Sequence, residues 1–313
     1  MAPATTPIIT ITTDGQLPHT SMPSTRVTDW LKSWPLALLP HHLLSRLVRS
    51  ATRWRVRWWK NLLMQLFIRH FRVDMSEAVH AEPDVYPDFN SFFTRALRDG
   101  IRPQPDAPSA IACPVDGTIS ELGPINGDSL LQAKGRHYSL VDLLGGNREQ
   151  ADTYRGGLFC TLYLSPRDYH RIHMPVDGRL RETTCIPGRL FSVAPHTTRA
   201  IAGLFTRNER LVTVFDSETG PVAVILVGAI FVACMETVWD GVVQPPGRGI
   251  EVKHYGPDAG NPVSLQRGQE LGRFNMGSTV ILLFPPGRAE WLPELQAGQA
   301  VRLGQTLGTV TTG

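Results

Sequence analysis

The sequence lacks closely spaced cysteines. Its four cysteines, Cys113, Cys160, Cys185 and Cys234, stand far apart and form no CxxC pair. This spacing supports neither a disulfide framework nor a cysteine-based zinc site. We expect the four cysteines to behave as small buried hydrophobic residues, in a protein that works in a reducing compartment. Long apolar runs are also missing, since no stretch of about 18 uninterrupted apolar residues occurs, and we expect no membrane-spanning helix.

The first 25 residues lack the features of a secretory signal. They are rich in threonine and proline and have no basic start followed by an apolar core. We expect residues 1–25 to form a disordered polar tail.

The overall composition is that of a globular protein. The 313 residues are 42% hydrophobic and 19% charged, enough for about two domains with a buried core. Glycine and proline, 28 and 25 residues, separate many short apolar runs, which favours strands and turns over helices. We predict an α+β fold, with a mainly β body of duplicated sandwich-like or barrel-like units preceded by an amphipathic helical region.

Acidic residues are missing from one long segment. Between Trp30 and Val73 there are nine lysines and arginines and no aspartate or glutamate. Five of the seven tryptophans lie between Trp30 and Trp59. This local excess of positive charge indicates a partner that binds locally.

A helical wheel over residues 44–66 separates apolar from basic side chains. The apolar face carries Leu44, Leu47, Val48, Ala51, Trp54, Trp58, Leu62 and Leu66, and the opposite face carries Arg46, Arg49, Arg53, Arg57 and Lys60. Such a helix suits the headgroup region of an anionic membrane. The wheel equally fits a helix packed on its own domain. A nucleic-acid surface is disfavoured, because the aromatic residues lie opposite the arginines.

Prolines divide the chain after this helix. Pro83 and Pro87 precede residues 88–93, which we predict to form a short capped helix, and further prolines mark a linker up to Pro108. The predicted divisions are a docking region over 26–75, a short helix and linker over 76–109, and a β-rich catalytic domain over 110–313.

Two pairs of segments echo each other, each as a turn followed by a strand. PVDGTI at 114–119 resembles PVDGRL at 175–180, and RGQELG at 267–272 resembles LGQTLG at 303–308. Because one aspartate of such a pair can be purely a turn residue, the echo alone does not separate Asp116 from Asp177.

The richest polar cluster, SPRDYHRIHMP at 165–175, follows an apolar run that we predict to be a buried strand. His170 and His173 can serve as acid and base, as metal ligands or as polar edge residues. The HxxH pattern lacks the glutamate of HExxH and has no obvious third ligand, so zinc gains no support.

Ser278 follows Gly277 at the start of the apolar run VILLF. The simplest interpretation is a bend at the entrance of a strand. Alternatively, the serine hydroxyl attacks the unshielded Gly277 carbonyl, turning the amide into an ester. β-Elimination then cuts the chain, and loss of ammonia leaves a pyruvoyl ketone. The route needs a base, such as a histidine oriented by a carboxylate.

Several segments in order resemble phosphatidylserine decarboxylases of the bacterial membrane-associated kind. They are TLYLSPRDYHRIHMP, CPVDGTISELG, LLQAKGRHYSLVDLLGG, FTRNERLVTVFD and GRFNMGSTVILLF. The similarity runs from about residue 39 to near the C-terminus, and the basic helix resembles the family's membrane-docking region.

The resemblance implies a role for each matched residue. Ser278 becomes the pyruvoyl cofactor after cleavage from Gly277, leaving a large chain and a small chain of residues 278–313. His173 matches the base, Asp116 its orienting carboxylate, and His170 a histidine associated with decarboxylation. Asp177 matches no catalytic position.

The resemblance also implies a reaction and partners. The pyruvoyl ketone would form a Schiff base with phosphatidylserine and accept electrons as CO2 leaves, giving phosphatidylethanolamine without a metal. We expect a peripheral protein on the cytoplasmic side of the cell membrane that binds no nucleic acid. The large and small chains would form a heterodimer, which often dimerises in this family. Two alternatives are a zinc hydrolase using His170 and His173, and a non-enzymatic β-sandwich module.

Overall fold

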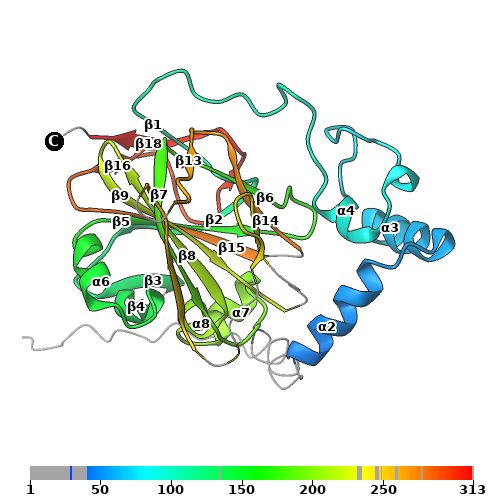
Figure 1. Ribbon diagram of the computed structural model, residues 1–313, viewed down its shortest axis with the longest axis horizontal. Helices are drawn as coiled ribbons and strands as arrows, with labels where there is room; N and C mark the ends of the chain where they lie inside the picture. Colours follow the sequence, from blue (N-terminus) through cyan, green and yellow to red (C-terminus); the bar gives the residue numbers. More distant parts are fainter. Residues whose placement is uncertain are drawn as a thin grey trace, which may run out of the picture.

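The computed structural model describes most of the chain (Figure 1). The residues described are 29, 41–133, 135–230, 235–243, 247, 249–257, 260–275 and 278–311. The predicted tail at 1–25, Cys234, Gly277, and the side chains of Leu44, Arg46 and Arg49 lie outside this set. The strands form one body, and the first helices lie together at one side of it (Figure 1).

The largest sheet has nine strands, and all its pairs are antiparallel. Its order is β12 (Glu251–His254), β7 (Gly178–Ile186), β8 (Arg210–Ser217), β9 (Gly220–Val227), β15 (Ser278–Phe284), β5 (Leu158–Leu164), β2 (Gly117–Pro124) and β17 (Ala300–Val301), with β13 (Ser264–Leu265) also on β7. Strand β15 therefore lies in the interior of the sheet.

Three smaller sheets complete the described body. One contains β1 (Ala110–Ala112), β18 (Thr306–Val310) and β16 (Ala289–Trp291); the second contains β11 (Gly241–Val243), β10 (Met235–Thr237), β14 (Glu270–Phe274) and β6 (Arg171–His173); the third pairs β3 (Ser129–Ala133) with β4 (Arg136–Ser139). The described sheets do not close into a barrel. The mainly β body and the small helical region confirm the predicted fold class.

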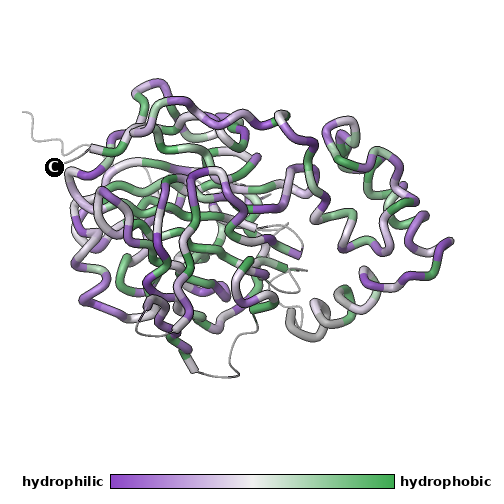
Figure 2. Tube along the Cα trace, turned by 45° about the horizontal axis from the view of Figure 1, so that its top comes forward, coloured by the Kyte–Doolittle hydropathy of each residue, from purple (hydrophilic) through white to green (hydrophobic). Residues whose placement is uncertain are grey.

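The central strands carry apolar runs that are buried on both faces of the sheet. Every residue of β15 is buried, and so are six of the eight residues in β9, which pairs with β15, and six of the eight in β8, which pairs with β9. Figure 2 shows hydrophobic residues, in green, through the middle of the β body. The described cysteines Cys113, Cys160 and Cys185 are free and buried, as predicted.

Each echoed segment is a turn followed by a strand, as predicted. Gly117 and Gly178 begin β2 and β7, and the second pair of echoes leads into β14 and β18. The two PVDG turns also make the same kind of hydrogen bond. Asp177 Oδ1 accepts from the backbone N–H of Arg267 at 2.6 Å, and Asp116 Oδ1 accepts from that of Leu303 at 2.8 Å. Each PVDG aspartate thus caps a turn in the other pair of echoes.

The chain over 44–66 is not one continuous helix, contrary to the wheel. It forms α2 (His41–Thr52) and α3 (Arg57–Phe71), separated by residues 53–56. The indole N–H of Trp59 donates to the Ala51 carbonyl at 3.0 Å. At this helix end the carbonyl accepts both from the indole and, at 3.4 Å, from the Trp54 backbone N–H. The remaining helices are η1 (Pro83–Val85), α4 (Phe89–Phe93), α5 (Leu140–Leu143), α6 (Arg148–Tyr154), α7 (Pro195–Ala200) and α8 (Leu204–Arg207).

The break changes which residues face water. Lys60, predicted on the exposed basic face, is buried, and its Nζ donates to the Asp84 carbonyl at 2.8 Å and to Asn61 Oδ1 at 2.9 Å. Leu47, Trp54, Trp58, Leu62 and Leu66 are exposed, between 47% and 67% of each residue. The predicted apolar face therefore does not pack on the described body.

The opposite side of α3 packs on α4. Phe67 contacts the rings of Phe89, Phe92 and Phe93 edge-on, with centroids 5.1 to 6.1 Å apart. Asp88 caps α4 by accepting from the Ser91 N–H at 2.8 Å. None of the helices that the structure describes is both long enough and apolar enough to cross a bilayer.

Candidate functional site

Ser278 is the first residue of β15 and lies between two strands. It pairs with Leu164 at the end of β5, and the next residue, Thr279, pairs with Val227 at the end of β9. The Ser278 side chain is fully buried, and its Oγ has no hydrogen-bond partner among the described residues. Leaving a buried hydroxyl unpaired costs about 1–3 kcal/mol, so this oxygen calls for a functional explanation.

Strand β6 brings the two histidines beside the chain that enters β15. It pairs with β14, so that His173 lies opposite Glu270, and the Phe274 N–H donates to the His170 carbonyl at 3.0 Å. Phe274 is only four residues before Ser278 in the sequence. The histidine segment and the approach to Ser278 are therefore neighbouring strands.

His170 is fully buried and stacked on an aromatic ring. Phe93 of α4 lies 4.0 Å away between centroids, with the planes 23° apart. Nε2 lies 3.1 Å from the Ser165 carbonyl, which can only accept, so Nε2 carries the proton. Nδ1 is then a bare acceptor, and it has no partner among the described residues. Burial, helped by the positive charge of Arg95, lowers the pKa of His170 to about 3.

His173 is oriented by a carbonyl and a phenol. Its Nδ1 lies 2.7 Å from the Gly268 carbonyl, so Nδ1 carries the proton. The Tyr169 hydroxyl donates to Nε2 at 3.1 Å. Burial lowers the pKa of His173, while the Gly268 hydrogen bond and the charges of Glu270 and Asp116 act to raise it. The ring is thus held in one tautomer, with its basic nitrogen facing Tyr169.

Asp116 does not make the hydrogen bond to His173 that its predicted role suggests. Its carboxylate accepts from the Leu303 N–H, and from Arg102 through Nε at 2.9 Å and Nη2 at 2.6 Å. Arg102 also donates to Glu77 at 2.6 Å. The negative charge of Asp116 acts to raise the pKa of His173, while the orienting bonds of the ring come from Gly268 and Tyr169.

Strand pairing still places Asp116 at the same end of the paired strands as Ser278. Thr118 pairs with Tyr163, so Gly117 lies opposite Leu164, which pairs with Ser278 on its other side. The absence of a side chain at Gly117 permits this pairing, because an added Cβ would lie 2.4 Å from the Tyr163 carbonyl oxygen. The PVDG turn and Ser278 are therefore two strand spacings apart, about 10 Å.

Sequence reasoning did not identify Arg102, Tyr169, Arg95 or Phe93. Tyr169 stood inside the polar cluster, so its position was a usable signal. Arg102 and Arg95 contact residues far away in the sequence, and no periodic pattern marks such pairs. Phe93 has the signal of a core aromatic, which does not reveal a histidine as its neighbour.

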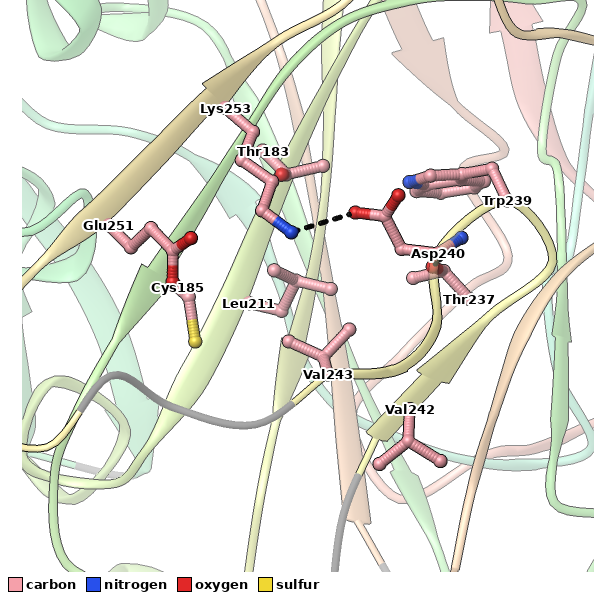
Figure 3. A pocket seen from close by; sticks show the side chains of 10 residues that line it. All are labelled: Thr183, Cys185, Leu211, Thr237, Trp239, Asp240, Val242, Val243, Glu251 and Lys253. Atoms are coloured by element: carbon pink, nitrogen blue, oxygen red, sulfur yellow. Dashed lines mark hydrogen bonds and ion pairs between the residues drawn. The ribbon is translucent and has the colours of Figure 1, made fainter. Parts of the chain in front are cut away.

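Three cavities differ in their relation to these residues. One of about 340 Å³ is lined by Asp116, Tyr169, Arg95 and Arg102 among others. The largest of the three, about 590 Å³, is lined by Asp177 and Ser217 among others. Ser217 ends β8 far from Ser278, because the opposite end of β8 lies beside the start of β15. A third, about 70 Å³, lies between β7, β12 and the β10–β11 pair (Figure 3). Of its two carboxylates, Asp240 accepts from Lys253 and Tyr255, and Glu251 is the other.

The described residues contain no group of three or more His, Cys, Asp or Glu arranged to hold a metal ion. His170 and His173 each donate one ring N–H to a backbone carbonyl, as imidazoles commonly do whether or not they bind metal. The geometry therefore adds nothing in favour of the zinc hydrolase alternative.

Known proteins similar to this chain belong to one family. A family model described as "Phosphatidylserine decarboxylase" matches residues 89–309, and a second, described as "PSD", matches residues 31–72. A "Phosphatidylserine decarboxylase proenzyme" of Nitrosococcus oceani is 54% identical over 287 residues, 92% of this chain and 94% of its own. Its namesake in Ectopseudomonas mendocina is 52% identical over 271 residues, 87% and 95% of the two chains. The predicted resemblance is confirmed, and the chain belongs to the phosphatidylserine decarboxylase family of carboxy-lyases.

Proposed function

We propose that this protein is a proenzyme that cuts its own chain between Gly277 and Ser278 and then decarboxylates phosphatidylserine at a membrane surface. The products of the second reaction are phosphatidylethanolamine and CO2. The observation that carries the proposal is the buried, unpartnered Ser278 hydroxyl, located where the segments of His170, His173 and Asp116 converge. Family membership gives the substrate class.

His173 is the proposed base for self-cleavage. Its Nδ1 proton is committed to Gly268, so Nε2 is the atom that can take the Ser278 proton, once Tyr169 releases its hydrogen bond. The oxygen then attacks the Gly277 carbonyl, and the peptide nitrogen leaves with a proton. The positive charge on His173 is stabilised by the Gly268 carbonyl, Glu270 and Asp116. Asp116 thus acts through its charge.

The position of Ser278 suits a pyruvoyl group. The group keeps the three carbons of serine, so it occupies the volume of the buried side chain without displacing β15. Its ketone supplies an electron sink for decarboxylation. The bare Nδ1 of His170 provides a hydrogen-bond acceptor in the same buried region, and Phe93 fixes the plane of that ring. His173, which faces Glu270 and Asp116, is the better placed of the two histidines to carry a proton.

The helical region is the proposed membrane contact. Trp54, Trp58, Leu62 and Leu66 project away from the body, and Arg55 and Arg57 in the same segment are exposed. Apolar side chains inserted at the headgroup level, flanked by cations, match an interfacial helix on an anionic leaflet. We place the protein peripherally on the cytoplasmic face of the cell membrane. After cleavage the large and small chains form a heterodimer, which we expect to dimerise.

The duplicated turns provide a matched test of Asp116. Asp116→Asn and Asp177→Asn both keep an oxygen to accept the turn N–H, and they differ in that Asp116→Asn removes a carboxylate near His173 together with its ion pair to Arg102. We expect the Asp177→Asn chain to split like wild type, and the Asp116→Asn chain to split about a hundredfold more slowly or not at all. A gel time course after cell-free synthesis measures this. Equal rates would reduce Asp116 to a turn residue.

The low pKa of His170 predicts a loss of stability in acid. The unfolded ring titrates near its ordinary pKa of about 6.5, whereas the folded ring stays neutral to about 3. The unfolded state therefore binds the proton first, and stability falls as the pH drops below about 6.5. Between about pH 7.5 and pH 5.5, urea unfolding of the Ser278→Ala chain should lose about 1.4 kcal/mol that the His170→Gln version of that chain does not lose. Equal losses would show that His170 is not held neutral.

Membrane contact is tested with vesicles containing anionic phosphatidylserine. Changing Trp58, Leu62 and Leu66 together to serine should weaken binding by at least about tenfold, because each buried apolar side chain contributes about 1.5–3 kcal/mol. Sedimentation with the vesicles measures the bound fraction. The matched control changes Val238, Val242 and Val252, which are exposed on the β body, to threonine. Loss of binding in the control alone, or in neither protein, would contradict the proposed surface.

A further inference from the structure

The cavity of about 340 Å³ lies where the helical region meets the Ser278 edge of the large sheet. Its lining comes from residues 72–77 just after α3, residues 95–102, residues 116–118 of the PVDG turn and β2, the segment after β5, and residues 300–302 of β17 and its end. Five of its lining side chains are arginines, namely Arg72, Arg95, Arg102, Arg167 and Arg302. Four others are carboxylates, so the lining carries an excess of positive charge.

Arg95 differs from the other arginines by being buried, with only 4% of the residue exposed. Its Nη2 donates to the Arg167 carbonyl at 3.2 Å, whereas Nε and Nη1 are buried with no acceptor among the described residues. A guanidinium cannot discard its charge at any ordinary pH, although burial lowers the pKa of Arg95. Buried donors left unpaired are costly, and an anion in the cavity would supply the missing acceptors.

The carboxylates of the cavity already have donors. Asp116 and Glu77 accept from Arg102, and Asp74 accepts from the backbone N–H and hydroxyl of Ser76. Asp168 accepts from the N–H and hydroxyl of Ser165, both at 2.7 Å, and burial raises its pKa. None of these groups satisfies the free nitrogens of Arg95. The Arg95 donors therefore lack a hydrogen-bond acceptor among the described residues, and an anion would be a suitable one.

The cavity also lies between the two other parts of the proposed site. On one side, Leu66 of the exposed apolar face is six residues before Arg72, or about 9 Å along the helix at about 1.5 Å per residue. On the other, Gly117 lies two strand spacings from Ser278, about 10 Å. A lipid with its chains against α3 would place its headgroup here.

We infer that this cavity binds the phosphodiester of the lipid headgroup, with Arg95 as the main donor. The inference rests on the proposed function, and it assigns the group that holds the substrate between the membrane and Ser278. In a phosphoserine headgroup, two carbons and an ester oxygen separate the phosphorus from the amine. Because this linkage is shorter than the about 10 Å between Gly117 and Ser278, the phosphate occupies the part of the cavity nearest Ser278, and the amine extends toward that residue.

The test measures binding to the uncleaved Ser278→Ala chain, so that no turnover is required. The probe is dihexanoyl phosphatidylserine, kept below its micelle concentration and titrated by calorimetry. Arg95→Gln removes the proposed donor, and Arg98→Gln is the matched control, since Arg98 is exposed in the same segment. We expect Arg95→Gln to raise the Kd by about tenfold or more and Arg98→Gln to leave it unchanged. Equal affinities in the two variants would overturn the inference.

Two further ligands identify the group that is bound. Dihexanoyl phosphatidylethanolamine has the phosphodiester without the carboxylate, and it should depend on Arg95 to the same degree. Dependence for the serine lipid alone would overturn the phosphate assignment in favour of the carboxylate. Inorganic phosphate should compete with the lipid in the Arg98→Gln chain, and free serine should not. Competition by serine alone would also contradict the inference.

Thermal unfolding covers the case in which a variant is damaged. Because Arg95→Gln removes buried N–H donors that have no acceptor among the described residues, this chain should melt no lower than Arg98→Gln without lipid, and lipid should raise the melting temperature of Arg98→Gln alone. An Arg95→Gln chain that does not fold would show that the fold, rather than a ligand, needs this side chain. If the wild-type chain never splits, the proposed function fails while the binding comparison stands. If it splits and decarboxylates but the variants bind equally, only this inference fails.

Discussion

Strand β15 is paired with β5 and β9 along nearly its whole length, and the position of the candidate site depends on that pairing. An interior strand with every side chain buried cannot shift its register without exposing apolar surface and breaking hydrogen bonds on both sides. The pairing of β15 consequently fixes the position of Ser278, its first residue. A serine that is proposed to act first as a nucleophile and then as the precursor of a ketone benefits from being held by a rigid strand.

The helical region and the β body meet at the histidines. Phe93 belongs to the aromatic cluster under α3 and also stacks on His170. The Thr94 carbonyl next to it accepts from Arg171, between the two histidines, at 2.9 Å. Helix α3, proposed to touch the membrane, is thus connected through α4 to the histidine segment, proposed to do the chemistry. This contact joins the two parts of the proposed site.

Local patterns in the sequence predicted the features that depend on neighbouring residues. The apolar run after Ser278, the echoed turns and the mainly β body are of this kind, and the family motifs were specific enough to identify the family. The break between α2 and α3 was missed, because the wheel tests only periodicity and carries no signal for a contact such as that of the Trp59 indole with Ala51 across the break. The Arg102–Asp116 pair and the buried Arg95 were missed because they join distant segments, for which spacing along the chain carries no signal.

The central claim is that Ser278 becomes a reactive ketone, and intact mass measurement of the purified wild-type protein tests it most directly. The account predicts two pieces, the smaller being residues 278–313 with a pyruvoyl group in place of its first serine. Reduction with cyanoborohydride in the presence of dihexanoyl phosphatidylserine should add a lipid-derived mass to that piece alone, and a Ser278→Ala chain should stay whole and unlabelled. A wild-type chain that remains uncut, a small piece that begins with an unmodified serine, or a Ser278→Ala chain that still splits would contradict the account.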